Sequence, residues 1–139
     1  MSEHTFWALL RASLDLNMDR VENKVMKGMP DVHFIKDGVS GWLELKFLKG
    51  WPRKRMPVGL KLNQVMWLDE YAKNGGRCWI LIRIGRDFIG LAHGEHARRF
   101  YEKPSKDEFT GLLSYLKRGN MNKEDWQELA QVITSTQDV

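Results

Sequence analysis

The stretch that decides the fold runs from Gly28 to Lys46 and reads GMPDVHFIKDGVSGWLELK. Its middle, Asp37-Gly38, is a dipeptide that tolerates the positive φ angles of a tight two-residue turn. After this turn Trp42 and Glu44 alternate with apolar residues, which is typical of a strand with two different faces. The stretch therefore predicts a β-hairpin.

A two-residue turn also sets which residues face one another across the hairpin. Val32 then lies opposite Leu43, and Asp31 lies opposite Glu44. Opposed side chains have Cβ atoms about 5 Å apart, and two carboxylates at that distance repel by roughly 3 kcal/mol at an effective dielectric near 20. Lys46 points to the same side as Glu44. We therefore predict two acids and a lysine at a sheet edge, a site suited to a divalent metal and a phosphate.

The prediction depends on the length of the turn. One extra residue on either side would move Glu44 and Lys46 to the other face of the sheet, and the site would not form.

Composition limits the class of protein. The chain has 139 residues, of which 42% are apolar and 11% aromatic, enough for the core of one domain. No apolar run approaches the roughly 20 residues of a membrane span. A single cysteine, Cys78, excludes an internal disulfide and a cysteine-based zinc site. It indicates a reducing compartment, which we expect to be the cytoplasm, or the host cytoplasm if the chain is viral.

The net charge of +4 is unevenly distributed. No acidic residue occurs between Leu45 and Leu68, and six residues of this stretch are candidates for nucleic-acid contact. They are Lys49, Trp51, Arg53, Lys54, Arg55 and Lys61. The alternative is a solvated basic loop without a partner.

Periodicity predicts the remaining elements. Helices are expected at residues 3–16 and 62–73, a doubly buried strand at 77–84 and a short strand at 88–92. The polar stretch 17–25 is ambiguous.

The C-terminal part, about residues 94–134, is predicted to be helical. A capping box at Ser105 to Glu108 precedes apolar residues at helical spacing up to Leu116. The whole chain is expected to form one domain, with its core at about residues 17–92.

Four other polar residues could belong to a site or simply to the surface. Glu22 is the acid of the stretch 17–25 that a metal site could recruit. His33 shares a face with Asp31, although a polar neighbour of the site is its commoner role. His93 and His96 have a metal-binding spacing without a third ligand, which favours a polar helix start.

These motifs resemble the signature of a known family. Pro30-Asp31 followed by Glu44-Leu45-Lys46 is similar to the motif of the PD-(D/E)XK nucleases. With Gly28 and the helix segment Leu62-Asn63-Gln64-Val65, the pattern over residues 20–92 looks like the VRR-NUC (virus-type replication-repair nuclease) branch. The small size is also similar to phage Holliday-junction resolvases of the same superfamily.

The resemblance implies an α/β, restriction-endonuclease-like core, in which helices flank a central mixed β-sheet, followed by C-terminal helices. It also implies Mg²⁺ or Mn²⁺ at the sheet edge. Asp31 and Glu44 would be metal ligands, with the Leu45 carbonyl as a third and Glu22 as an upstream acid.

The resemblance likewise implies roles for two further residues. Lys46 would orient or deprotonate the attacking water. Gln64 would lie near the scissile phosphate, in the first turn of a helix whose positive end favours an anion. Solvent exposure is the alternative for Gln64.

The function expected from these features is metal-dependent endonuclease cleavage of branched DNA in replication, recombination or repair, by a homodimer. Two alternatives remain open. One is a DNA-binding module of the same fold that does not cleave. The other is an exonuclease or nickase of the same superfamily.

Overall fold

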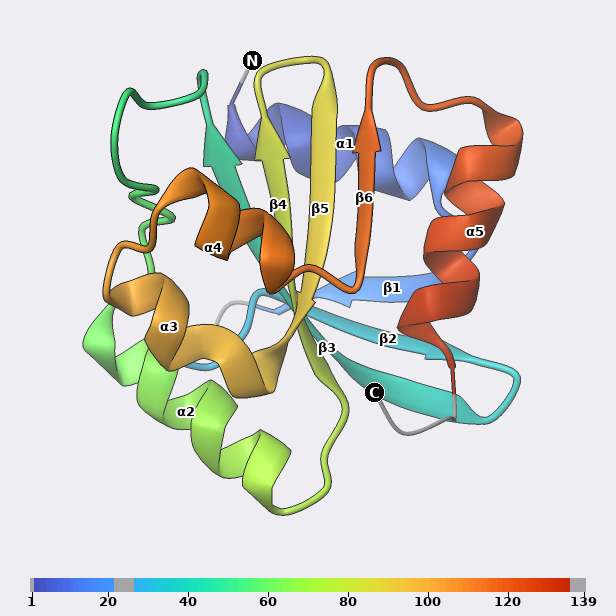
Figure 1. The fold of residues 1–139 in the computed structure, drawn as a ribbon. Helices are drawn as coiled ribbons and strands as arrows, with labels where there is room; N and C mark the ends of the chain where they lie inside the picture. Colours follow the sequence, from blue (N-terminus) through green and yellow to red (C-terminus); the bar gives the residue numbers. More distant parts are fainter. Residues whose placement is uncertain (1, 22–26, 136–139) are drawn as a thin grey trace.

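The structure of the chain is a computed structural model that describes residues 2–21 and 27–135. Its centre is a six-stranded sheet whose spatial order follows the chain order (Figure 1). β3 and β4 are parallel and every other neighbouring pair is antiparallel, so the sheet is mixed, as predicted. The strands are β1 (Asn17–Arg20), β2 (Val32–Lys36), β3 (Val39–Leu48), β4 (Cys78–Ile84), β5 (Phe88–His93) and β6 (Tyr115–Arg118).

Helices cover both faces of the sheet. One face carries α1 and α5, and the other carries α2, α3 and α4 (Figure 1). Their bounds are α1 (Glu3–Ser13), α2 (Leu62–Lys73), α3 (Ala97–Tyr101), α4 (Lys106–Gly111) and α5 (Lys123–Ile133), and a short 3₁₀ helix η1 (Gly94–His96) precedes α3. None of the helices in the described part of the chain has the length and apolar character of a membrane span.

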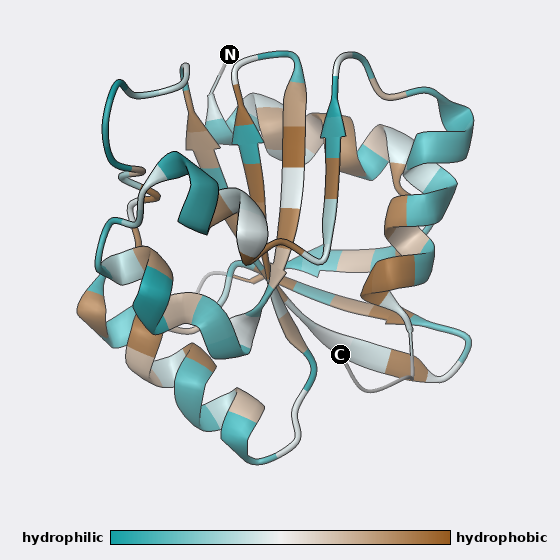
Figure 2. Cartoon of the chain, viewed as in Figure 1, coloured by the Kyte–Doolittle hydropathy of each residue, from teal (hydrophilic) through white to brown (hydrophobic). Residues whose placement is uncertain are grey.

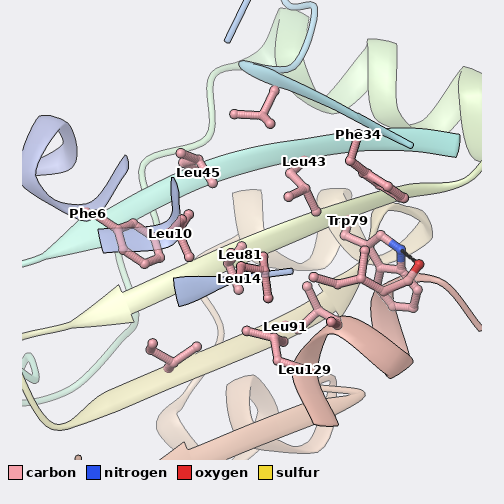
Figure 3. Packing of buried hydrophobic residues seen from close by; sticks show 14 of the residues in the cluster. Phe6, Leu10, Leu14, Phe34, Leu43, Leu45, Trp79, Leu81, Leu91 and Leu129 are labelled. Atoms are coloured by element: carbon pink, nitrogen blue, oxygen red, sulfur yellow. Dashed lines mark hydrogen bonds between the residues drawn. The ribbon is translucent and has the colours of Figure 1, made fainter. Parts of the chain in front are cut away.

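β4 divides the apolar interior into two clusters. Trp79 and Leu81 pack towards α1 and α5, while Ile80 and Ile82 pack towards α2, α3 and α4. Figure 2 shows this strand as mostly hydrophobic, apart from a hydrophilic band towards its end. In the first cluster, the Trp79 indole also donates a hydrogen bond to the Ile133 carbonyl at 3.1 Å (Figure 3). The almost continuous apolar sequence of β4 is therefore explained by burial on both faces.

The hairpin has the predicted register. Asp37 and Gly38 form its turn with φ angles of 50° and 80°, and Val32 pairs with Leu43. The paired part of the hairpin ends there, because β2 begins at Val32. β3 nevertheless continues beside β4 until Leu48 pairs with Ile84. From Glu44 onwards, therefore, no described strand pairs with the edge of β3 that faces β2.

Two expectations about elements need correction. The ambiguous stretch 17–25 contributes a strand, β1, which pairs antiparallel with β2. The helix predicted up to Leu116 ends at Gly111, and residues 115–118 form β6. The reason is tertiary: β6 hydrogen-bonds to the edge of β5, with Leu116 opposite Gly90, and this edge is remote in sequence. The C-terminal part is thus not purely helical.

Gly28 docks the chain that precedes β2 against the start of α2. Its φ is +94°, and a β-carbon there would lie 2.4 Å from the Asn63 carbonyl oxygen and 3.2 Å from the Gln64 nitrogen. No other residue fits so close to the backbone. The contact therefore ties the approach to Asp31 to the first turn of α2.

We predict that Gly28→Ala destabilises the protein more than Gly59→Ala. Gly59 has a similar φ of +89°, but nothing lies within 4 Å of a β-carbon built there. Both variants incur the strain of a positive φ, on the order of 1–2 kcal/mol, and Gly28→Ala adds a clash with α2, for a total of roughly 3 kcal/mol. Urea unfolding followed by circular dichroism measures both losses, and equal losses would contradict the docking of Gly28 on α2.

Candidate active site

Glu44 is the centre of the candidate site. It is 1% exposed, so its carboxylate is almost completely removed from solvent. One oxygen, Oε2, accepts a hydrogen bond from Gln64 Nε2 at 3.0 Å and lies 3.2 Å from Lys46 Nζ. The other oxygen, Oε1, is buried without a hydrogen-bond partner among the described residues. Buried polar atoms are seldom left in this state, so Oε1 is a candidate acceptor for a ligand from outside the chain.

Asp31 occupies the open edge of β3. It lies one residue before the Val32–Leu43 pair, at the level of Glu44, and its Oδ2 accepts a hydrogen bond from the Leu45 amide at 3.1 Å. In an extended strand the N–H and the carbonyl of one residue point to the same side. The Leu45 carbonyl therefore points towards the side on which Asp31 lies.

Gln64 links α2 to the acids. Its Oε1 accepts hydrogen bonds from the Lys61 amide at 2.9 Å and from Lys46 Nζ at 3.3 Å, and its Nε2 is the donor to Glu44. The amide group thus bridges the first turn of a helix and the contact between Glu44 and Lys46 on β3. Solvent exposure, the alternative considered for Gln64, is excluded.

The electrostatics favour an added cation. Burial raises the pKa of Glu44 to about 8; the Asp31 charge contributes to the rise and Lys46 opposes it. At neutral pH the folded protein therefore holds a proton on Glu44. A divalent cation beside the two carboxylates would displace that proton by favouring the ionised form.

Glu3 is a residue that the sequence argument missed. It lies in the first turn of α1, half-buried; burial raises its pKa, as does Asp31, while Lys46 and Arg20 lower it. α1 therefore brings a third acid into the electrostatic range of the site. A signal was available, because Glu3 is three residues before Phe6 and seven before Leu10 and so lies on the buried stripe of the helix.

The residues fit a metal, although no complete ligand set is built from side chains. Within residues 2–21 and 27–135, no group of three His, Cys, Asp or Glu side chains is close enough to hold a metal ion. The unpaired Glu44 Oε1 and the Asp31 carboxylate are nevertheless oxygen donors of the kind that Mg²⁺ and Mn²⁺ prefer. These ions commonly complete their coordination with water.

The other candidate polar residues lie outside this cluster. Glu22 is outside the described residues. The His33 ring packs edge-on against Trp42 at 5.0 Å. His93 caps η1 by accepting a hydrogen bond from the Glu95 amide, and His96 Nε2 lies 3.4 Å from Glu95 Oε1, in agreement with a polar helix start.

The basic stretch connects β3 to α2. These two elements are in contact through the hydrogen bond from Lys46 to Gln64. Its cations Lys49, Arg53, Lys54, Arg55 and Lys61 are exposed. Two members also hold the stretch in place. The Trp51 ring packs against Phe88 and Phe109 at centroid distances of 4.8 and 6.0 Å, and Arg55 Nη1 donates to the Lys103 carbonyl at 2.9 Å.

Comparison with known proteins supports the fold. Neither a family model nor a curated protein sequence matches the chain. Among solved structures, it resembles Hjc, a Holliday junction resolvase from the archaeal hyperthermophile Archaeoglobus fulgidus, with a TM-score of 0.51 over 94% of this chain and 96% of that chain. The sequence identity is 14%, so the likeness concerns the fold alone. The predicted α/β fold, a mixed central sheet flanked by helices, is confirmed, whereas the VRR-NUC branch stays a prediction.

We predict that stability falls as the pH rises when no metal is present. Between the ordinary glutamate pKa of 4.5 and about 8, Glu44 is protonated in the folded state and ionised in the unfolded state. Deprotonation therefore drives unfolding, by on the order of several kcal/mol across that range. Urea unfolding in EDTA at pH 5 and pH 8 measures the loss, and Glu44→Gln removes this contribution.

Urea unfolding of the wild type and of Glu44→Gln also tests whether the site binds a metal ion. Mn²⁺ added at pH 8 is expected to stabilise the wild type much more than Glu44→Gln, because the substitution leaves Asp31 without the second carboxylate that would hold the cation. A wild type whose stability matches that of Glu44→Gln at both pH values would contradict the raised pKa.

Proposed function

We propose that the chain is a divalent-metal-dependent endonuclease that hydrolyses phosphodiester bonds in branched DNA. The observation that carries the proposal is Glu44, a buried carboxylate with an unpaired oxygen beside Asp31 and Lys46. The likeness of the fold to that of a Holliday junction resolvase supports the choice of branched DNA as substrate.

Asp31, Glu44 and the Leu45 carbonyl would hold Mg²⁺ or Mn²⁺. Such an ion lowers the pKa of a bound water and neutralises charge on a phosphate oxygen. Glu3 would contribute a further negative charge from α1, and we propose it as an acid of the site in addition to Glu22.

Lys46 would position the attacking water. Its ammonium group is held between Glu44 Oε2 and Gln64 Oε1 at 3.2 and 3.3 Å, and 13% of its side chain is exposed. It therefore presents a fixed positive charge at the edge of the acid cluster, where it can donate a hydrogen bond to a water or a phosphate oxygen. Gln64 would keep Lys46 and Glu44 in this arrangement.

The exposed basic stretch would place the DNA. Since the stretch leads from β3, which carries Lys46, to α2, which carries Gln64, phosphates bound along it would lead the DNA towards the acids. Phosphate contacts of this kind position DNA without reading its sequence. Because a symmetric cut of a four-way junction needs two active sites, the proposed active form is a homodimer.

We predict that the protein cleaves a four-way junction in Mg²⁺ or Mn²⁺ but not in EDTA. Asp31→Asn and Glu44→Gln should each reduce the rate at least about 100-fold, because a catalytic metal supplies several kcal/mol of transition-state stabilisation. Glu102→Gln, an exposed acid of similar size, serves as the control and should cleave at the wild-type rate. Gel analysis of end-labelled junctions measures the rates.

Two further substrates separate the alternatives. A matched linear duplex tests the preference for branches, and a covalently closed circle tests endonuclease action, since an exonuclease cannot open it. Metal-independent binding of the junction without any cleavage would favour the non-cleaving module. Undiminished cleavage by Glu44→Gln would refute the assigned site.

We also predict that Lys54→Ala weakens DNA binding through lost charge alone. Each lysine–phosphate contact contributes about 0.9 to the slope of log affinity against log salt for duplex DNA. Lys54→Ala should therefore lower that slope by about 0.9 on junction and linear DNA alike, whereas Lys123→Ala, at an exposed lysine in the first turn of α5, should not change it. Fluorescence anisotropy in EDTA over a range of NaCl concentrations measures the slopes, and equal slopes for the wild type and Lys54→Ala would remove Lys54 from the interface.

A further inference from the structure

Arg83 is a buried cation that the proposed nuclease site does not use. It is 7% exposed on β4, and its Nε donates a hydrogen bond to the Gly85 carbonyl at 3.1 Å. Its Nη1 is buried without a hydrogen-bond partner among the described residues. An unpaired buried charge is strongly unfavourable, so a group that is only structural would be expected to have a counter-ion.

Among the described residues, no acidic side chain forms a salt bridge with Arg83. Its guanidinium lies over the Phe6 ring, 6.0 Å from the centroid, which compensates only part of the cost of burial. Burial lowers the pKa of Arg83, and the second positive charge nearby, Arg86, lowers it further. Arg83 and Arg86 therefore place two positive charges close enough to repel each other.

Both arginines line one cavity of about 270 Å³. It lies where α1, the β4–β5 turn and the connection between β6 and α5 meet. Asn120 adds a side-chain amide to the lining, while Leu9, Met121 and Trp126 form apolar walls. No acidic residue is among the residues that line it. The cavity thus brings two arginines and an asparagine together beside apolar walls.

We infer that this cavity binds a phosphate group between Arg83 and Arg86. A guanidinium offers N–H donors in a planar fork that matches the oxygens of a phosphate, and two cations match its double charge better than that of a carboxylate. The cavity is also large enough for a phosphate with part of a sugar attached.

The phosphate could belong to DNA or be free in solution. Arg83 is opposite Phe47, three residues beyond Glu44 on β3, which is about 10 Å along the sheet. It faces α1, whereas Glu44 faces α2, so a DNA phosphate held there would come from a different part of the substrate than the scissile one. Only this DNA source rests on the proposed function.

The test uses the full-length protein in EDTA and inorganic phosphate as the probe. Calorimetric titration at constant ionic strength should show binding to the wild type. Arg83→Gln and Arg86→Gln should each weaken it about tenfold or more, since a hydrogen bond to a charged group contributes that factor or more. Arg98→Gln, an exposed arginine on α3, is the matched control and should bind phosphate like the wild type.

A stability measurement distinguishes a binding arginine from a structural one. Arg83→Gln removes an unpaired buried charge, so its melting temperature without phosphate should equal or exceed that of the wild type. Phosphate should raise the melting temperature of the wild type and of Arg98→Gln, but not that of Arg86→Gln. If Arg83→Gln does not fold, Arg86→Gln still carries the test.

Binding of a labelled four-way junction in EDTA identifies the source. Weaker junction binding by Arg83→Gln and Arg86→Gln supports a DNA phosphate, and unchanged junction binding together with lost phosphate binding supports free phosphate. A wild type that does not bind phosphate, with variants that bind the junction normally, overturns the inference. A protein that binds phosphate but cleaves no DNA would instead refute the proposed function alone.

Discussion

The unequal reach of the two neighbours of β3 is the constraint on which the candidate site depends. β2 pairs with β3 only as far as Val32 and Leu43, whereas β4 accompanies β3 to Leu48. Over the remaining residues no strand of the described chain pairs with the β2-side edge of β3, and at Leu45 the Asp31 carboxylate accepts the amide hydrogen bond instead. The carboxylate oxygens of Asp31 and Glu44 and the Leu45 carbonyl are thereby brought to this edge of β3.

The burial of Glu44 makes this edge chemically useful. Gln64 and Lys46 compensate one carboxylate oxygen and leave the other unpaired. Burial disfavours the ionised form of the Glu44 carboxyl group and thereby raises its pKa to about 8. Gly28 and α2 hold the arrangement together from outside the sheet, so the site is formed before any ligand arrives. Preformed sites of this kind avoid reorganisation during a reaction.

The same sheet carries a second buried ionisable side chain, and this one is basic. Glu44 and Arg83 each have one buried atom without a partner among the described residues. They cannot compensate each other, because strand alternation directs Glu44 towards α2 and Arg83 towards α1. The proposed metal site and the proposed phosphate site would therefore lie on opposite faces of the sheet.

The sequence by itself determined the hairpin, its register and the meeting of Asp31, Glu44 and Lys46, because a two-residue turn and strand alternation are local geometry. It also placed Gln64 in the first turn of a helix. Only the tertiary structure decided that α1 brings Glu3 to the acids, that residues 115–118 extend the sheet, and that Arg83 has no salt-bridge partner among the described residues. Each of these depends on the packing of elements that are distant in sequence, and apolar spacing around Leu116 suits a helix until the open edge of β5 supplies hydrogen bonds.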